Sequence, residues 1–123
     1  MRLIVEDNAE LLELLSEYFS ASYSVHTTVN GKQGLEKTLA IHPDIIVSDV
    51  MMPEMSGKQM CYRIKNNVNI SHIPVVLLTA QATTEQTIEG YMYGADEYII
   101  KPFNLDLLMA RCNNLINSRR QLY

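Results

Sequence analysis

Short apolar runs alternate along this chain with segments of helical periodicity, and this alternation constrains the fold more than any other feature. Five runs rich in β-branched or aromatic residues predict strands at residues 2–5, 23–27, 45–48, 75–78 and 98–100. The central residues of the first, third and fourth runs are continuously apolar, which is typical of strands covered on both faces. Strict alternation with short connections indicates a parallel sheet with helices on both sides.

Apolar residues between these runs recur at the spacing of an amphipathic helix. The stripes are Leu11, Leu14, Leu15, Tyr18 and Phe19; Met60, Cys61 and Ile64; Ile88, Tyr91, Met92 and Ala95; and Leu105, Leu108, Met109, Cys112 and Ile116. Asn30 is expected to cap a further helix that begins at Gly31, and Gly94 to follow the end of the fourth helix. The pattern therefore predicts an α/β fold with a doubly wound, five-stranded parallel sheet of the flavodoxin-like type.

Composition fits one soluble domain. The 123 residues are 47% hydrophobic and 20% charged, and no run approaches the roughly 18 apolar residues of a membrane span. The 14 acidic residues outnumber the 10 basic ones, which argues against direct nucleic-acid binding. The only basic cluster, Arg119 and Arg120, is interpreted as solvated charge at a helix end.

The cysteines and histidines carry no recognisable metal or redox spacing. Cys61 and Cys112 are predicted to be buried free thiols in a reducing compartment. His26, His42 and His72 lie far apart in the pattern and are expected to share no face, so neither a metal nor a relay role is assigned to them.

Polar residues follow four of the predicted strands. Glu6 and Asp7 end the first strand, Asp49 the third, Thr79 the fourth and Lys101 the fifth. In open parallel sheets these carboxyl ends meet at one edge, where ligands bind. We therefore expect the five side chains to converge.

Their combined chemistry suits phosphoryl transfer to a carboxylate. Like charges about 4 Å apart repel by roughly 4 kcal/mol at an effective dielectric constant near 20, so a cation is needed among the carboxylates. Few oxygen ligands with room for water and phosphate favour Mg²⁺. Lys101 supplies a positive charge and Thr79 a hydroxyl group, and such catalysis relies mainly on positioning and charge stabilisation.

The sequence resembles the receiver (response-regulator) domain of two-component signalling over nearly all of its length. The segments that carry the resemblance are residues 4–8 (IVEDN), 43–53 (PDIIVSDVMMP), 73–80 (IPVVLLTA) and 94–103 (GADEYIIKPF). The resemblance implies that the fold is a (βα)5 receiver fold. This sequence departs from the family pattern at two positions. Glu6 stands where an aspartate is common, and Tyr98 stands where a phenylalanine is common.

The resemblance also implies a metal site. Asp49 would be the phospho-acceptor, which attacks a phosphohistidine of a kinase. Asp7 and Asp49 would bind Mg²⁺ directly, together with the backbone carbonyl of Met51. Glu6 would bind the ion directly or through water.

The remaining roles implied by the resemblance concern the switch. Lys101 would contact a phosphoryl oxygen, and Pro102 would follow a cis peptide bond that aims this lysine. Thr79 would move toward the phosphoryl group and Tyr98 would turn inward behind it. These movements would change the surface formed by the fourth helix, the fifth strand and the fifth helix, through which a homodimer can form.

The implied function is that of a switch rather than an enzyme, with self-catalysed phosphotransfer and autodephosphorylation. Its partner would be a histidine kinase or phosphotransfer domain in the cytoplasm, with neither nucleic-acid nor membrane contact by this segment. Residues 71–74, 79–82 and 117–120 are similar to receivers of hybrid sensor histidine kinases. We accordingly expect residues 1–123 to be one receiver domain from a longer chain, in which a kinase can be membrane-anchored.

Two other protein classes place functional residues at the same strand ends, namely flavodoxin-like carriers and Mg²⁺-dependent phosphohydrolases. A flavodoxin-like carrier needs a glycine- and hydroxyl-rich phosphate loop after the first strand, whereas residues 6–9 are EDNA. A Mg²⁺-dependent phosphohydrolase normally has a second aspartate two residues after its nucleophile, and Met51 occupies that position here. Both observations favour the signalling switch.

Overall fold

Strands and helices alternate along the whole described chain, which comprises residues 1–80 and 83–121 of a computed structural model. The strands are β1 (Arg2–Val5), β2 (Val25–Thr28), β3 (Ile45–Asp49), β4 (Val75–Thr79) and β5 (Glu97–Ile100). The helices are α1 (Ala9–Ser20), α2 (Gly31–Ile41), α3 (Gly57–Lys65), α4 (Thr84–Met92) and α5 (Leu105–Gln121). Gln81 and Ala82, in the segment expected to be similar to hybrid receivers, and the side chain of Arg120 lie outside the described residues.

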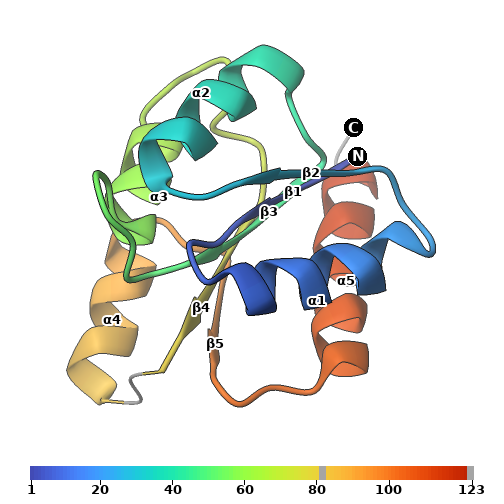
Figure 1. The fold of residues 1–123 in the computed structure, drawn as a ribbon. Helices are drawn as coiled ribbons and strands as arrows, with labels where there is room; N and C mark the ends of the chain where they lie inside the picture. The colour runs from blue at the N-terminus through green and yellow to red at the C-terminus, as the bar shows by residue number, and fades with distance from the viewer. Residues whose placement is uncertain (81–82, 122–123) are drawn as a thin grey trace.

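The five strands form one parallel sheet in the order β2-β1-β3-β4-β5. Val5 pairs with Ser48, and Asp49 pairs with Leu78, so the carboxyl ends of the three central strands are nearly level. Helices α1 and α5 cover one face, and α2, α3 and α4 lie on the other (Figure 1). The predicted doubly wound α/β fold is confirmed.

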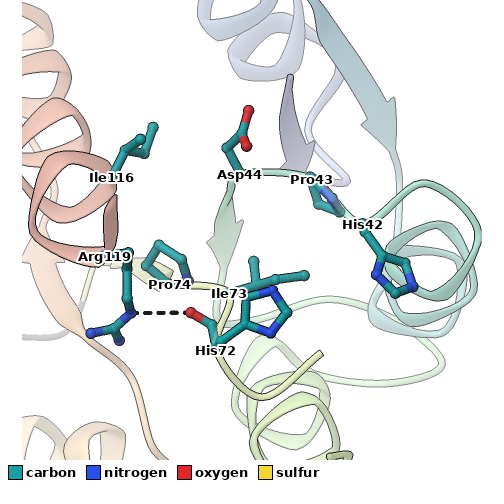
Figure 2. Close-up of a pocket in the computed structure, with 8 residues that line it drawn as sticks. All are labelled: His42, Pro43, Asp44, His72, Ile73, Pro74, Ile116 and Arg119. Atoms are coloured by element: carbon teal, nitrogen blue, oxygen red, sulfur yellow. Dashed lines mark hydrogen bonds between the residues drawn. The ribbon is translucent and has the colours of Figure 1, made fainter. Parts of the chain in front are cut away.

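The opposite edge of the sheet, at the amino ends of the strands, differs from the prediction in two respects. Arg119 is not merely solvated: its Nη2 lies 2.6 Å from Asp96 Oδ1, and its Nε donates to the carbonyl of His72 at 3.0 Å (Figure 2). Arg119 lies within α5, because this helix continues to Gln121, beyond Ser118, where its apolar pattern ends. His42 and His72 also line one pocket, because the α2–β3 and α3–β4 loops approach the strands from neighbouring positions.

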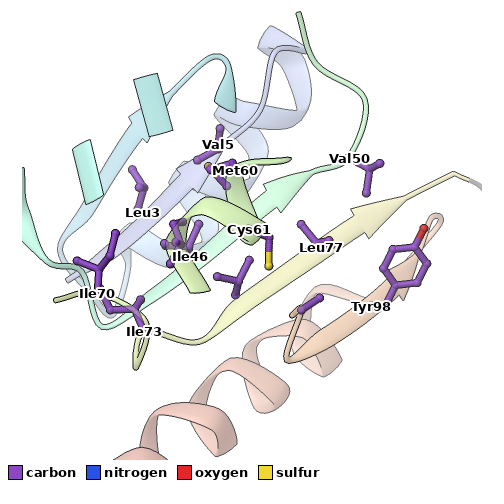
Figure 3. Close-up of a cluster of buried hydrophobic side chains, with 13 residues drawn as sticks. Leu3, Val5, Ile46, Val50, Met60, Cys61, Ile70, Ile73, Leu77 and Tyr98 are labelled. Carbon is purple, nitrogen blue, oxygen red and sulfur yellow. The ribbon is translucent and has the colours of Figure 1, made fainter. Parts of the chain in front are cut away.

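Each face of the sheet has its own buried cluster. The cluster beneath α2 and α3 includes Leu3, Ile46, Leu77, Met60 and Ile64 (Figure 3). The cluster beneath α1 and α5 uses the alternate strand residues, as well as buried helix residues that include Phe19 and Cys112. Because successive strand side chains point to opposite faces, a continuously apolar strand supplies both clusters.

Two helical stripes are less buried than the spacing predicts. Leu14 on α1 is exposed, and on α4 the side chains of Ile88, Tyr91 and Met92 are exposed as well. Helix α4 contacts the sheet through Gly90 instead, since a Cβ atom there would lie 2.8 Å from the ring of Tyr98. Three residues of the predicted stripe are therefore exposed, whereas the fourth, Ala95, lies beyond the end of α4 and is buried in the core.

Two local predictions are confirmed, and one strand begins later than expected. Asn30 caps α2 by accepting from Gln33 N, and Gly94, with φ of +97°, follows the end of α4. Strand β2 begins at Val25 because the N–H of Tyr23 still donates to Phe19 at the end of α1. Within the described residues, no helix is both long and apolar enough to span a bilayer.

Both cysteines are free and fully buried, as predicted. Burial raises the pKa of Cys61 to about 12 and that of Cys112 to about 11. Because the thiolate is the reactive form, neither thiol is expected to react in the native state near neutral pH.

We expect the native protein at pH 8 to leave both thiols unmodified by Ellman's reagent on the time scale of minutes. The same protein in concentrated guanidinium chloride should release two equivalents of the coloured product. Fast release from the native protein would contradict this assignment of the two side chains to the core.

Candidate functional site

Three carboxylates meet at the carboxyl end of the sheet. Glu6 and Asp7 directly follow β1, and Asp49 is the last residue of β3, which pairs with β1. One oxygen from each side chain lies within 4.8 Å of the other two. Since the strand order reverses between β1 and β3, this is the crevice in which open α/β sheets bind ligands.

The turns after the two strands hold these side chains in place. After β1, Asn8 caps α1 by accepting from Leu11 N, and its own N–H donates to Glu6 Oε2 at 3.2 Å. After β3, Gly57 N donates to the carbonyl of Val50 at 2.9 Å, and a Cβ atom at Gly57 would lie 2.1 Å from the carbonyl oxygen of Asp49. Only glycine allows α3 to begin this close to Asp49.

Lys101 is the cation of the cluster. Its Nζ lies 3.1 Å from Asp49 Oδ1 and 3.6 Å from Glu6 Oε1. The peptide bond between Lys101 and Pro102 is cis, which confirms that prediction, and the N–H of Lys101 donates to the carbonyl of Thr79. The sequence therefore predicted correctly that the fifth strand brings a lysine to the carboxylates of the first and third strands.

The cluster holds more negative charge than Lys101 balances. Glu6 is 1% exposed, and its Oε1 accepts no hydrogen bond from any described residue. Burial raises the pKa of Glu6 to about 7, with a smaller contribution from Asp49, against the opposing effects of the Asn8 N–H and Lys101. A buried acceptor without a donor among three close carboxylates is the arrangement that a divalent cation satisfies.

Thr79 and Tyr98 lie on neighbouring strands beside this cluster. Thr79 ends β4 and is 3% exposed, whereas Tyr98 lies within β5 and is 7% exposed. The Tyr98 ring packs against Gly90 of α4, and the ring of Tyr91 lies 6.3 Å away. The aromatic side chain is therefore turned inward, between the end of the sheet and α4.

Lys58 also belongs to this region, although the sequence pattern did not predict it. The Nζ of Lys58, on α3, lies 5.9 Å from the centroid of the Tyr98 ring and 3.4 Å from Glu89 on α4. Its side chain links two helices that are adjacent only in the folded chain. The one sequence signal was the capping box formed by Ser56 and Gln59, which fixes the start of α3 but not its neighbours.

Met51 occupies the loop between β3 and α3. Its side chain is 70% exposed, so it forms no part of the buried cluster. Its role as a backbone ligand stays a prediction.

The arrangement as a whole provides an acidic, partly buried edge with one lysine and one buried hydroxyl group. This combination is suited to binding a cation together with a phosphoryl group.

Comparisons with known proteins point to one family. The family model described as the response regulator receiver domain matches residues 3–113. Hybrid signal transduction histidine kinase D of Dictyostelium discoideum is 41% identical over 96% of this chain, which covers 8% of that protein. Response regulator ArlR of Staphylococcus aureus is 35% identical over 97% of this chain, which spans 53% of that protein.

A solved structure shows the same fold. The signal receiver domain of a signal transduction histidine kinase from Syntrophus aciditrophicus is 31% identical, with a TM-score of 0.88, over 95% of this chain and 89% of that one. The family match, these relatives and the shared fold lead to one conclusion. This chain belongs to the response regulator receiver domain family.

Proposed function

We propose that Asp49 accepts a phosphoryl group from the phosphohistidine of a histidine kinase or phosphotransfer domain, in the cytoplasm and with Mg²⁺ bound. Receiver domains are phosphorylatable switches of two-component signalling, and such partners are general in these systems. The observation that carries the proposal is the position of Asp49, paired with Lys101 at 3.1 Å within a cluster of three carboxylates.

The transfer requires little of the protein beyond positioning. An Asp49 carboxylate oxygen attacks phosphorus, the phosphorus–nitrogen bond of the donor breaks, and the imidazole leaves with the electron pair. Lys101, which already lies beside Asp49, is placed to contact an oxygen of the transferred group. Hydrolysis of the aspartyl phosphate returns the chain to its first state, and we propose that the chain catalyses both steps on itself.

The donor set fits Mg²⁺. Asp7, Asp49 and the carbonyl of Met51 would hold it, with Glu6 as a direct or water-mediated partner. The bound ion would neutralise charge on the carboxylates and on the phosphoryl oxygens. The buried Oε1 of Glu6, which accepts no hydrogen bond from any described residue, supports this proposal independently of the family resemblance.

We also propose that the response reaches the face formed by α4, β5 and α5. Phosphorylation adds acceptor oxygens that recruit Thr79, and this would favour the inward position that the Tyr98 ring already occupies in this structure. The exposed apolar residues on this face make it suitable for a partner or for a second copy of the chain. They are Ile88, Met92, Ile100 and Leu107.

Phosphorylation should depend on Asp49. With Mg²⁺ and acetyl phosphate, we expect the intact mass of the wild-type protein to rise by one phosphoryl group and that of Asp49→Asn to stay unchanged. Asp106→Asn, which removes a carboxylate on α5, is the matched control and should be modified like the wild type. Equal modification of Asp49→Asn would place the acceptor elsewhere.

Lys101 should couple phosphorylation to the change in structure. We expect Lys101→Ala to bind Mg²⁺, because the carboxylates remain, but to lose the phosphorylation-dependent shifts of α4 in amide NMR spectra. Lys32→Ala, at an exposed position on α2, should respond like the wild type. If Lys101→Ala shows wild-type shifts on activation with beryllofluoride, then this lysine does not provide the coupling.

Asp7 should destabilise the metal-free fold. Its carboxylate faces two others and forms no ion pair among the described residues, so Asp7→Asn should raise the free energy of unfolding by about 1 kcal/mol in EDTA. The same change should remove the stabilisation that Mg²⁺ gives the wild type in thermal unfolding. Glu13→Gln, an equal loss of charge on the exposed side of α1, should show neither effect.

A further inference from the structure

A buried arginine without a carboxylate partner lies at the opposite edge of the sheet from Asp49. Arg2 begins β1 and is 2% exposed. Among the described residues it forms no ion pair, although burial of a charge is costly unless the charge is paired. Burial lowers the pKa of this guanidinium from its ordinary value, but an arginine stays protonated at neutral pH.

The contacts of Arg2 leave its hydrogen-bonding capacity incompletely used. Nη2 donates to Asn113 Oδ1, and Nη1 donates to the thioether sulfur of Met109, which is a weak acceptor. Nε is buried and has no partner in the described part of the chain. The guanidinium carbon lies 3.5 Å from the centroid of the Tyr23 ring and 5.3 Å from that of Phe19. Aromatic rings stabilise the cation but accept none of its in-plane protons.

Arg2 lines a pocket of about 300 Å³ together with polar side chains from α5 and from the turn after α1. Tyr23 donates its hydroxyl proton to Asn113 at 2.9 Å, so one amide oxygen accepts from both Tyr23 and Arg2. Asp44 is the acidic side chain of this pocket, and in the structure it is paired with the amino group of Met1 at 2.6 Å. A second pocket, of about 390 Å³, shares Asp44 and is lined further along by Arg119 (Figure 2).

We propose that Arg2 anchors an anion-binding site at the amino-terminal edge of the sheet, which takes the carboxylate or phosphate group of a small ligand. An oxyanion in the pocket supplies the negative charge that no described side chain pairs with Arg2. A planar guanidinium suits such a group, because neighbouring N–H donors on one edge match two oxygens of a carboxylate or phosphate. The site is independent of Asp49 and of the function proposed above.

Two substitutions separate this site from a structural role of Arg2. Asn113→Asp replaces the amide that accepts from Arg2 with a carboxylate of nearly the same shape, so it should neutralise Arg2 internally without harming the fold. We expect it to weaken anion binding at least about tenfold and to leave the melting temperature equal or higher. Asp44→Asn removes the one acidic group of the pocket and should strengthen binding.

The test follows the Nε–H signal of Arg2 in proton–nitrogen NMR spectra. Inorganic phosphate and acetate are titrated separately into metal-stripped protein at constant ionic strength, set with sodium chloride. We expect a saturable shift in the wild type, a tighter one in Asp44→Asn and none over the same range in Asn113→Asp. Saturation by acetate alone assigns the site to carboxylates, by phosphate alone to phosphates, and by both to oxyanions in general.

Three results would overturn the proposal. One is a wild-type signal that moves without saturation with both anions, since Arg2 is then satisfied by water alone. Another is an equal affinity of the Asn113→Asp variant and the wild-type protein for the anions. The third is a response confined to the amide signals of Asp49 and Lys101, which would assign the anion to the opposite edge of the sheet.

Discussion

The repulsion among Glu6, Asp7 and Asp49 is the constraint around which this domain is organised. Three carboxylates whose oxygens lie within 4.8 Å of one another repel, and this repulsion lowers the free energy of unfolding. The chain limits this cost by three means: a lysine beside two of the carboxylates, an N–H that donates to Glu6, and a raised pKa at Glu6. Each of them compensates only in part, so the site retains a need for positive charge.

The parallel sheet makes this arrangement possible because its strong burial holds the strand ends rigidly. Strands β1, β3 and β4 are covered on both faces, and their buried side chains fix the level at which each strand ends. Asp49 therefore cannot withdraw from Glu6 without disturbing the register of β3 against β1. Packing of the core thus keeps the like charges close together, and the start of α3 at Gly57 packs against the backbone of Asp49.

The sequence was sufficient for the fold and for the residues of the acidic edge, because both follow from local patterns. Continuous apolar runs indicate covered strands, and polar residues directly after such runs must meet at one edge. Contacts between elements were beyond this reasoning. The apolar residues at helical spacing on α4 are exposed, and Gly90 makes the contact with Tyr98 instead. Nothing in the spacing distinguishes a stripe that packs from one that stays exposed.

Long polar side chains were the second source of error. Arg119 and Lys65 both pair with Asp96, which joins the end of α5, the end of α3 and the start of β5. Such pairs depend on where distant helices end in space, and a local window of sequence contains no information on that. The burial of Arg2 is of the same kind, since its neighbours come from α1, the turn after α1 and α5.

The two edges of the sheet pose opposite electrostatic problems. The carboxyl edge has an excess of negative charge, and the amino edge has a guanidinium without a paired carboxylate among the described residues. The chain as a whole carries a net charge of −4, which does not favour long-range attraction of anions. Any anion at Arg2 must therefore be held by short-range contacts, which a buried guanidinium can provide because salt screens buried pairs much less than exposed ones. The geometry around Arg2, rather than the overall charge, decides whether that edge binds.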